Sequence, residues 1–320
     1  MSIHHPALPP GVRVFERGWL SANNVLCEGP EGTALVDSGY VSHAAQTLAL
    51  VEHALGGRPL QRLLNTHLHS DHCGGNAALQ ARYPGLRTAI PPGQAEAVRA
   101  WDEARLSYRA TGQDCARFTF DALLTPGATV TLAGRGWQIH AAPGHDPDAV
   151  MLFEPASRTL ISGDALWQHG FGVVFPELEG EPGFDAVAAT LDLIERLAPR
   201  VVIPGHGSPF GDAAHGGAGP AAPVAAALAL ARQRLQALAA DPARHRRHAL
   251  KVLLKFKLLQ WQRQPLAAVH AWARQVPLLV RLHAHHGGGA PFDAWLQALV
   301  DDLCASGAAR RDGDVLVDGG

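Results

Sequence analysis

Four side chains able to bind a metal ion lie close together in the first half of the chain. They are His67, His69, Asp71 and His72, in the stretch N-T-H-L-H-S-D-H-C-G-G that begins at Asn65. Imidazole nitrogen and carboxylate oxygen suit a borderline divalent metal such as Zn²⁺. The chain has 18 histidines, so one or two stray ones would prove nothing. Four candidate ligands at this spacing predict a metal site.

An apolar run ending at Leu64 comes before these residues and predicts a buried strand over Leu60–Thr66. If strand geometry continues to His69, then His67 and His69 point to the same side, because side chains alternate along a strand. The chain must then turn so that Asp71 and His72 face the same place. Two glycines after Cys73 permit such a turn or close backbone packing.

Three further turns carry metal-type residues directly after expected strands. His145 lies in Pro-Gly-His-Asp after the strand Trp137–Ala141, Asp164 ends Ser-Gly-Asp, and His206 lies in Pro-Gly-His-Gly after Val201–Ile203. Loops at one rim of a sheet layer can converge on one place. With the first four residues they make seven candidate ligands, enough for two metals that share a carboxylate.

The pattern H-x-H-x-D-H with downstream G-H, G-D and G-H-G resembles the metallo-β-lactamase superfamily, with spacing closest to its glyoxalase II-like hydrolases. The resemblance covers about residues 10 to 210 and implies an α/β (α+β) fold, a four-layer αββα sandwich. It also implies the ligand sets of two metal sites. These are His67, His69 and His145 at the first, Asp71, His72 and His206 at the second, and Asp164 bridging the two.

Two divalent metal ions are therefore expected as cofactors, with Zn²⁺ favoured and Fe or Mn as alternatives. Two metals about 3.5–4 Å apart can hold one hydroxide between them, which would attack an acyl carbon or phosphorus. Asp71 could also orient the hydroxide proton and act as general base. Side chains that orient metal-bound imidazoles matter as well. Ser70, Asp146 and Asp148 are the candidates for that role by their place in the sequence.

Substrate contacts are expected from two other places. Trp167, His169 and Phe171 directly follow the bridging residue Asp164. Tyr108 and Arg109 lie in a long insertion between the two sheet halves, residues 91–126, which contains an expected helix over Gln94–Tyr108. An insertion of this length is typical of a lid or a substrate wall, although a surface decoration is the alternative.

At 320 residues the chain can form one large domain and a smaller one. Gly211–Pro223 is rich in Gly, Ala and Pro and reads as a linker, so we expect a catalytic domain over 1–215 and a C-terminal domain over 216–320. Expected helices in the second domain are Val224–Ala240, Arg246–Gln262, Leu266–Val276 and Phe292–Ala305. A short hairpin or strand over Arg310–Val317 makes this domain similar to the winged-helix-like extension of some superfamily members.

Charge divides the chain unevenly. Residues 221–320 carry 13 Lys or Arg against 7 Asp or Glu, whereas residues 1–220 carry 14 against 22. The basic C-terminal part weakly favours an anionic partner there.

Other classes of protein are disfavoured by composition. No apolar run reaches the length of a membrane span, and the start of the chain lacks a secretory signal, so a cytoplasmic location is expected. The four cysteines are scattered without a C-x-x-C pair, which disfavours a disulfide framework or a Cys-rich zinc module. The composition is compatible with a homo-oligomer.

The leading hypothesis is a dinuclear metal-dependent hydrolase of an ester-type small molecule, either a thioester or a lactone. No glutathione-binding set can be matched in the C-terminal region, so hydroxyacylglutathione is not indicated as the substrate. The first alternative is a phosphodiesterase or nuclease, motivated by the basic C-terminal domain. The second is an iron-dependent oxygenase on the same scaffold.

Overall fold

The structure, a computed structural model, describes residues 6–212 and 220–320. The chain forms two compact units. The first contains Met1–Trp101 and Cys115–Ala237, and the second contains Asp102–Asp114 and Leu238–Gly320. Most of the expected linker and the expected boundary at residue 215 lie outside the described residues, so the domain limits stay a prediction.

The first unit contains two six-stranded sheets. The first sheet has the strand order β1-β2-β3-β4-β5-β6. Its strands are β1 (Val12–Phe15), β2 (Asn24–Gly29), β3 (Gly32–Val36), β4 (Arg62–Leu64), β5 (Arg87–Ile90) and β6 (Ala122–Leu123). Strands β3 to β6 run parallel, and the register pairs Val36 with Leu64.

The second sheet has the order β12-β11-β10-β9-β8-β7. Its strands are β7 (Thr129–Leu132), β8 (Arg135–Ala141), β9 (Val150–Glu154), β10 (Thr159–Gly163), β11 (Val201–Pro204) and β12 (Phe210–Gly211).

The two sheets share one apolar core. Val25, Val36 and Leu64 of the first sheet pack in one cluster with Trp137 and Ile161 of the second. Successive side chains of a strand point to opposite faces. The neighbours Leu26, Leu35 and Leu63 therefore pack on the outer face of the first sheet, in a second cluster with residues of α1 and α3. Alternation in these strands thus builds a helix layer and a sheet-on-sheet core at once.

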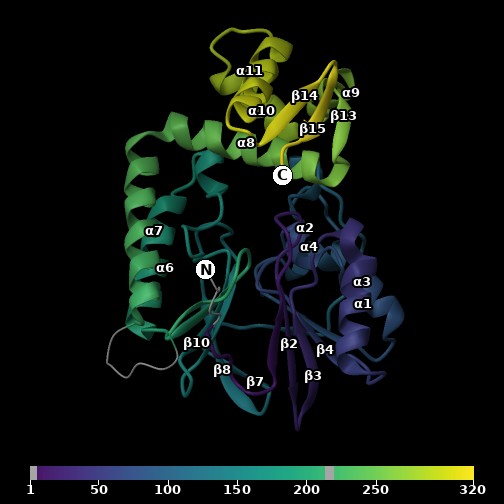
Figure 1. Ribbon diagram of the computed structural model, residues 1–320, viewed down its shortest axis with the longest axis vertical. Coiled ribbons are helices and arrows are strands. Elements are labelled where there is room, and N and C mark those ends of the chain that lie inside the picture. Colours follow the sequence, from purple (N-terminus) through teal and green to yellow (C-terminus); the bar gives the residue numbers. More distant parts are fainter. Residues whose placement is uncertain (1–5, 213–219) are drawn as a thin grey trace. The chain divides into compact units, whose positions relative to one another are not determined.

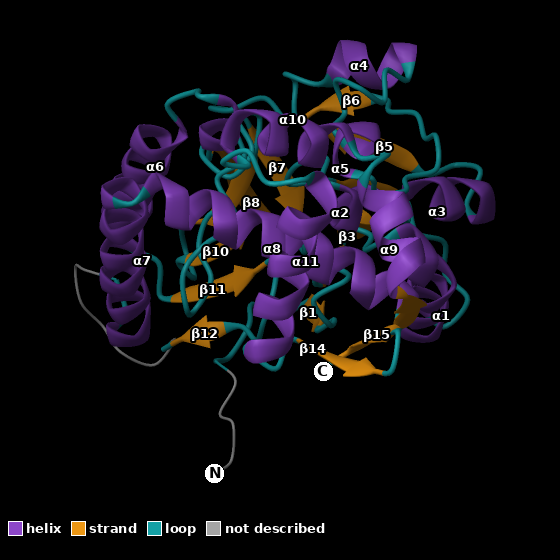
Figure 2. Cartoon of the chain, turned by 90° about the horizontal axis from the view of Figure 1, so that it is seen from above, coloured by secondary structure: helices purple, strands orange, loops and turns teal. Residues whose placement is uncertain are grey.

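Helices cover the outer faces of the sheets, so the predicted αββα sandwich is confirmed. Figure 1 shows α1 and α3 beside β3 and β4 on one side, and Figure 2 shows α6 and α7 beside β10 and β11 on the other. Arg232 of α7 donates to Asp192 and forms an ion pair with Glu195, both of α6. The helices of this unit are η1 (Val41–His43), α1 (Ala44–Leu55), α2 (Ser70–Cys73), α3 (Asn76–Arg82), α4 (Ala95–Ala100), η2 (Pro176–Glu179), α6 (Gly183–Leu197) and α7 (Ala222–Ala240).

The second unit combines helices with a small three-stranded sheet of order β13-β15-β14, which confirms a mainly helical C-terminal extension. Its likeness to a winged helix stays a prediction. Its strands are β13 (Arg263–Pro265), β14 (Ala309–Asp312) and β15 (Val315–Asp318). Its helices are α5 (Tyr108–Thr111), α8 (Pro242–Trp261), α9 (Leu266–Ala273), α10 (Pro277–His286) and α11 (Phe292–Ala305).

Two expected elements are wrong. The helix expected over Gln94–Tyr108 is two short helices, α4 and α5, because Trp101 and Ser107 adopt left-handed backbone angles (φ 55° and 66°) that interrupt it. The expected strand over Leu60–Thr66 shortens to β4, so His67 and His69 lie in a loop and not on a strand.

Within residues 6–212 and 220–320, no helix is both long enough and apolar enough to span a membrane.

Candidate metal centre

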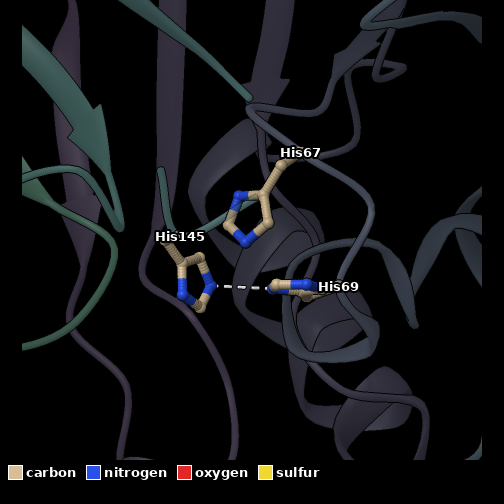
Figure 3. A group of neighbouring side chains, drawn as sticks. All are labelled: His67, His69 and His145. Atoms are coloured by element: carbon tan, nitrogen blue, oxygen red, sulfur yellow. Dashed lines mark hydrogen bonds between the residues drawn. The ribbon is translucent and has the colours of Figure 1, made fainter. Parts of the chain in front are cut away.

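Three imidazoles converge in the first unit. The side chains of His67, His69 and His145 offer ligand atoms that all lie within 4.8 Å of one another, and we call these residues the three-histidine group. Figure 3 shows the rings pointing toward a common centre, with His69 Nδ1 2.7 Å from His145 Nε2. Three neutral imidazoles around one point match a common zinc ligand set.

Loops at strand ends hold these rings. His67 follows β4, and His69 lies directly before α2, with extended backbone angles. His145 follows β8 and donates its Nδ1–H to the carbonyl of Val173 at 2.5 Å. That bond fixes the tautomer of His145 and leaves Nε2 free to bind a metal.

A second group lies beside the first. Asp71, His72, Asp164 and His206 also offer ligand atoms within 4.8 Å of one another, and we call these residues the mixed group. Asp71 and His72 come from α2, Asp164 follows β10, and His206 follows β11. The Nε2 atom of His206 lies 3.0 Å from Asp71 Oδ2.

Asp164 faces both groups. Its Oδ2 lies 3.4 Å from His145 Nε2, whereas its Oδ1 lies 3.3 Å from His72 Nε2 and 3.9 Å from His206 Nε2. One carboxylate oxygen therefore points toward each set of imidazoles. This arrangement fits a carboxylate shared by two metals.

Buried nitrogen atoms test whether metals fit here. Among the described residues, His67 Nε2, His72 Nε2 and His206 Nδ1 are buried without a hydrogen-bond partner. An unpartnered buried polar atom is costly. Coordination to a divalent ion would satisfy His67 Nε2 and His72 Nε2, which face the other ligand atoms, so the donor set fits two divalent metals.

The pKa values of the imidazoles differ between the two groups. Burial lowers the pKa of His67 well below its usual value and, together with His72 and His69, keeps that ring neutral. Burial lowers the pKa of both His69 and His145 to about 4. Neutral imidazole is the form that binds a metal, so the three-histidine group is already in its ligating form at neutral pH.

Carboxylates dominate the mixed group. Burial by itself would lower the pKa of His72, but Asp164, Asp37 and Asp71 outweigh it and raise that pKa well above its usual value. Burial would raise the pKa of Asp164, but His72 and His206 outweigh it and hold that pKa well below its usual value. Asp164 is therefore a carboxylate, the form that can bridge two cations.

Asp37 orients one ligand of each group. Its Oδ2 accepts a hydrogen bond from His72 Nδ1 at 2.8 Å and another from the Thr66 hydroxyl at 2.8 Å. The Thr66 hydroxyl lies 3.1 Å from His67 Nδ1. Because this hydroxyl donates to Asp37, it accepts from His67, and both rings keep Nε2 for a metal. Asp37 was not among the predicted site residues, although an acid directly after a buried strand is a usable signal.

Gly205 is required by the close packing of the ligands. A Cβ atom on this residue would lie 2.3 Å from Asp164 Oδ1 and 2.9 Å from His72 Cε1. Only glycine lets the loop that carries His206 approach the other ligands so closely.

The residues expected to orient the ligands lie in different environments. Asp146 is buried, with its Oδ2 3.6 Å from His69 Nε2. Asp148 donates its backbone N–H to Asp146 Oδ1 at 2.7 Å, and Ser70 is buried at the start of α2. Asp146 thus contacts an imidazole of the site.

The residues expected to contact substrate are spread over several environments. Trp167 donates its indole N–H to Asp164 Oδ1 at 3.2 Å, so it touches the centre directly. His169 is exposed, whereas Phe171 is buried beneath the guanidinium of Arg234. Tyr108 and Arg109 belong to the second unit. Their roles as substrate contacts stay predictions.

Two aromatic residues beside the ligands were not singled out as site residues in the sequence. The ring of Phe175 lies 5.4 Å from that of His69 and 5.7 Å from that of His145. Trp19 stacks on His206, with ring centroids 5.3 Å apart. Trp19 lies in the segment between β1, which ends at Phe15, and β2, which begins at Asn24. No local signal identifies either contact.

Comparison with known proteins identifies the family of this chain. Residues 17–206 match the family model described as the metallo-beta-lactamase superfamily. The chain belongs to this superfamily.

Individual relatives are similar over part of their length. A hydroxyacylglutathione hydrolase of Synechococcus sp. (strain JA-3-3Ab) is 35% identical over 44% of this chain and 46% of its own. The type A flavoprotein fprA of Rhodobacter capsulatus is 27% identical over 63% of this chain and 49% of its own. The chain thus spans about half the length of the curated relatives it matches.

A solved structure agrees with the fold over nearly the whole chain. A metallo-beta-lactamase family protein from Thermus thermophilus aligns with a TM-score of 0.54 at 21% identity. The alignment covers 98% of this chain and 100% of that protein.

The two ligand groups predict that single substitutions remove different metals. In His69→Ala the three-histidine group loses a ligand, and in His72→Ala the mixed group does. Each variant should fall from about two bound metals to about one. Co²⁺-loaded variants should then give different visible absorption spectra, because their remaining ligand sets differ. Identical spectra from both variants would contradict the division into two groups.

Asp37→Asn tests the orienting carboxylate. The amide has about the same shape, and Asn tolerates the left-handed backbone of residue 37 (φ 60°). The Asn amide group would place an N–H donor against one of the three donors that now bind the Asp37 carboxylate. Metal affinity should therefore fall about 10–100-fold, as measured by competition with a chelator. Asp121→Asn is the matched control, because Asp121 accepts the Thr88 backbone N–H beside edge strand β6. Equal effects of the two substitutions would remove Asp37 from this role.

Gly205→Ala should displace Asp164 and His72, lowering both metal content and the free energy of unfolding, the latter by about 1–3 kcal/mol. Elemental analysis and urea denaturation measure the two effects. Gly85→Ala is the control, since a Cβ there meets nothing within 4 Å. A Gly205→Ala protein with two metals and unchanged stability would show that the close approach is not needed.

Proposed function

We propose that this chain is a dinuclear metal-dependent hydrolase of an ester-type small molecule, with thioesters and lactones as the substrate class. The observation that carries the proposal is the position of Asp164, with one carboxylate oxygen toward each ligand group. Asp71, His72 and His206 would hold one metal, and His67, His69 and His145 the other. Zn²⁺ is the favoured ion, with Fe or Mn as alternatives.

Two divalent ions held there would activate a water molecule and stabilise negative charge on the substrate oxygen. The chain's own residues have distinct tasks. Asp164 stays ionised, and the Trp167 N–H bonded to its Oδ1 limits its basicity. The side chain of Asp71 is 14% exposed against 6% for Asp164. Asp71 is thus the carboxylate more open to water, and we assign to it the holding of the proton that the attacking water loses.

The choice of an ester-type substrate rests on the similarity to hydroxyacylglutathione hydrolases. The name of those relatives describes hydrolysis of a glutathione conjugate, and this chain shares about half of their length. The proposal therefore extends to the bond type and not to glutathione.

A redox reaction is the second candidate, because the flavoprotein relative matches a longer part of this chain than the hydrolase does. Iron in the purified protein with substrate-dependent oxygen uptake would favour it.

The ion pairs of the second unit weaken the case for the phosphodiesterase alternative. Five of its basic side chains form ion pairs with acids of the same unit. The pairs are Arg247–Asp302, Lys255–Asp318, Lys257–Asp114, Arg274–Asp293 and Arg311–Asp301. The positive charge that suggested a nucleic-acid partner is therefore partly neutralised within the unit.

A substrate panel after metal analysis tests the proposal. We expect about two metals per chain, hydrolysis of a thioester or a lactone, and loss of that activity with a chelator and its return with Zn²⁺. The inactive control is His69→Ala, which lacks one side chain of the three-histidine group. Turnover of a phosphodiester in place of the esters, or a metal content well below one, would refute the proposal.

A further inference from the structure

Among the described residues, Trp19 is the most exposed large hydrophobic side chain. It is 60% exposed, whereas Leu123, Leu230 and Val280 are 40–42% exposed. Single exposed apolar side chains are ordinary on protein surfaces. Trp19 differs from the others because it lies directly on a candidate metal ligand.

Three rings form a corner at the mixed group. The indole of Trp19 stacks on His206 at an interplanar angle of 15°. Trp167 stands edge-on to both, with ring centroids 5.4 Å from Trp19 and 5.4 Å from His206. Because Trp167 also donates to Asp164, the corner made by Trp19 and Trp167 begins at the candidate metal centre itself.

The loop that carries Trp19 is anchored to the ligand loops. The backbone N–H of Ala22 donates to the carbonyl of Asp71 at 2.9 Å, and that of Asn23 donates to Gly205 at 2.7 Å. The Asn23 side chain donates to the carbonyls of Pro204 and Gly207 and accepts from the Arg17 N–H. Residues 17–23 are thus held in place, so the exposed indole is an ordered surface. A surface ordered in advance loses little entropy when it binds.

The chemistry of this corner selects its ligand. Indole faces bind planar aromatic rings by stacking or edge-to-face contact, and they also attract organic cations. Two divalent metals at the adjacent ligand groups would repel a cationic group. A neutral planar ring is therefore the better match.

We propose that Trp19 and Trp167 form a subsite for a planar aromatic group of the substrate, next to the scissile bond. This inference rests on the proposed hydrolase function and adds the substrate class. Trp19 and Trp167 then determine specificity, and an aromatic ester or thioester is preferred over an aliphatic one of similar size.

Binding of product-like carboxylates tests the subsite without any turnover. Calorimetry on the metal-loaded protein compares 3-phenylpropionate with hexanoate. We expect about tenfold tighter binding of the aromatic acid, in line with the strength of aromatic pairs. Trp19→Ala should abolish this preference, and Trp19→Phe should keep most of it. Leu123→Ala, a truncation of another exposed side chain of the same unit, should leave the preference unchanged.

Kinetics separate the subsite from the hydrolase function. The 3-phenylpropionyl and hexanoyl thioesters of N-acetylcysteamine share a leaving group, whereas phenyl acetate carries its ring on the leaving side. Loss of preference in Trp19→Ala should appear mainly as a higher KM for whichever aromatic substrate is preferred, with metal content unchanged. If no ester is hydrolysed but the aromatic acid still binds more tightly through Trp19, the subsite stands and the hydrolase function fails.

Several results would overturn the subsite. Equal binding of the two acids by the unaltered protein would do so, as would preference for a choline ester. A change of oligomeric state in Trp19→Ala on size-exclusion chromatography, with the aromatic preference intact, would instead identify Trp19 as a contact between copies of the chain. A preference lost equally in Trp19→Phe and Trp19→Ala together with loss of a metal would show that the ring only supports His206.

Discussion

The carboxylate of Asp37 is the point on which the candidate metal centre depends. Three donors meet there, namely the Thr66 backbone N–H, the Thr66 hydroxyl and His72 Nδ1. Through them a single buried charge sets the orientation of His72 directly and of His67 through Thr66. The backbone N–H of Asp37 donates to the carbonyl of Leu64, so the parallel pairing of β3 with β4 fixes the carboxylate itself. The register of β3 against β4 thereby determines how the His72 and His67 side chains are oriented.

The residues of the two candidate groups could be selected from the sequence because their signals are local, and their role as metal ligands stays a prediction. His145, Asp164 and His206 each follow a glycine shortly after an apolar run, and the other four lie within the six residues His67–His72, after the apolar run that ends at Leu64. The two compact groups contain the same seven residues that the sequence suggested. The pairing of His145 with His67 and His69 came from the resemblance, since spacing along the chain cannot state which loops meet.

Features that depend on tertiary contacts were not predictable. Strand β1 ends at Phe15, and the Asn23 side chain further along donates to the carbonyls of the distant residues Pro204 and Gly207. The sequence near Trp19 contains no signal for these hydrogen bonds. The helix expected over Gln94–Tyr108 breaks where the chain passes from one compact unit to the other at Trp101. Helix α10 was missed, although Pro277 at its first turn is a common helix start.

That passage between units has a consequence for the order of folding. Leu106 and Tyr108 are each 1% exposed and belong to the same unit as the C-terminal helices, with α5 in contact with α10. Both residues leave the ribosome long before Pro277–His286 exists, so their final burial must wait until most of the chain has been synthesised. During this interval the segment that contains Leu106 and Tyr108 exposes their apolar side chains to water. If the C-terminal helices were removed, Leu106 and Tyr108 would stay exposed. A chain truncated in this way would therefore carry an uncovered apolar loop.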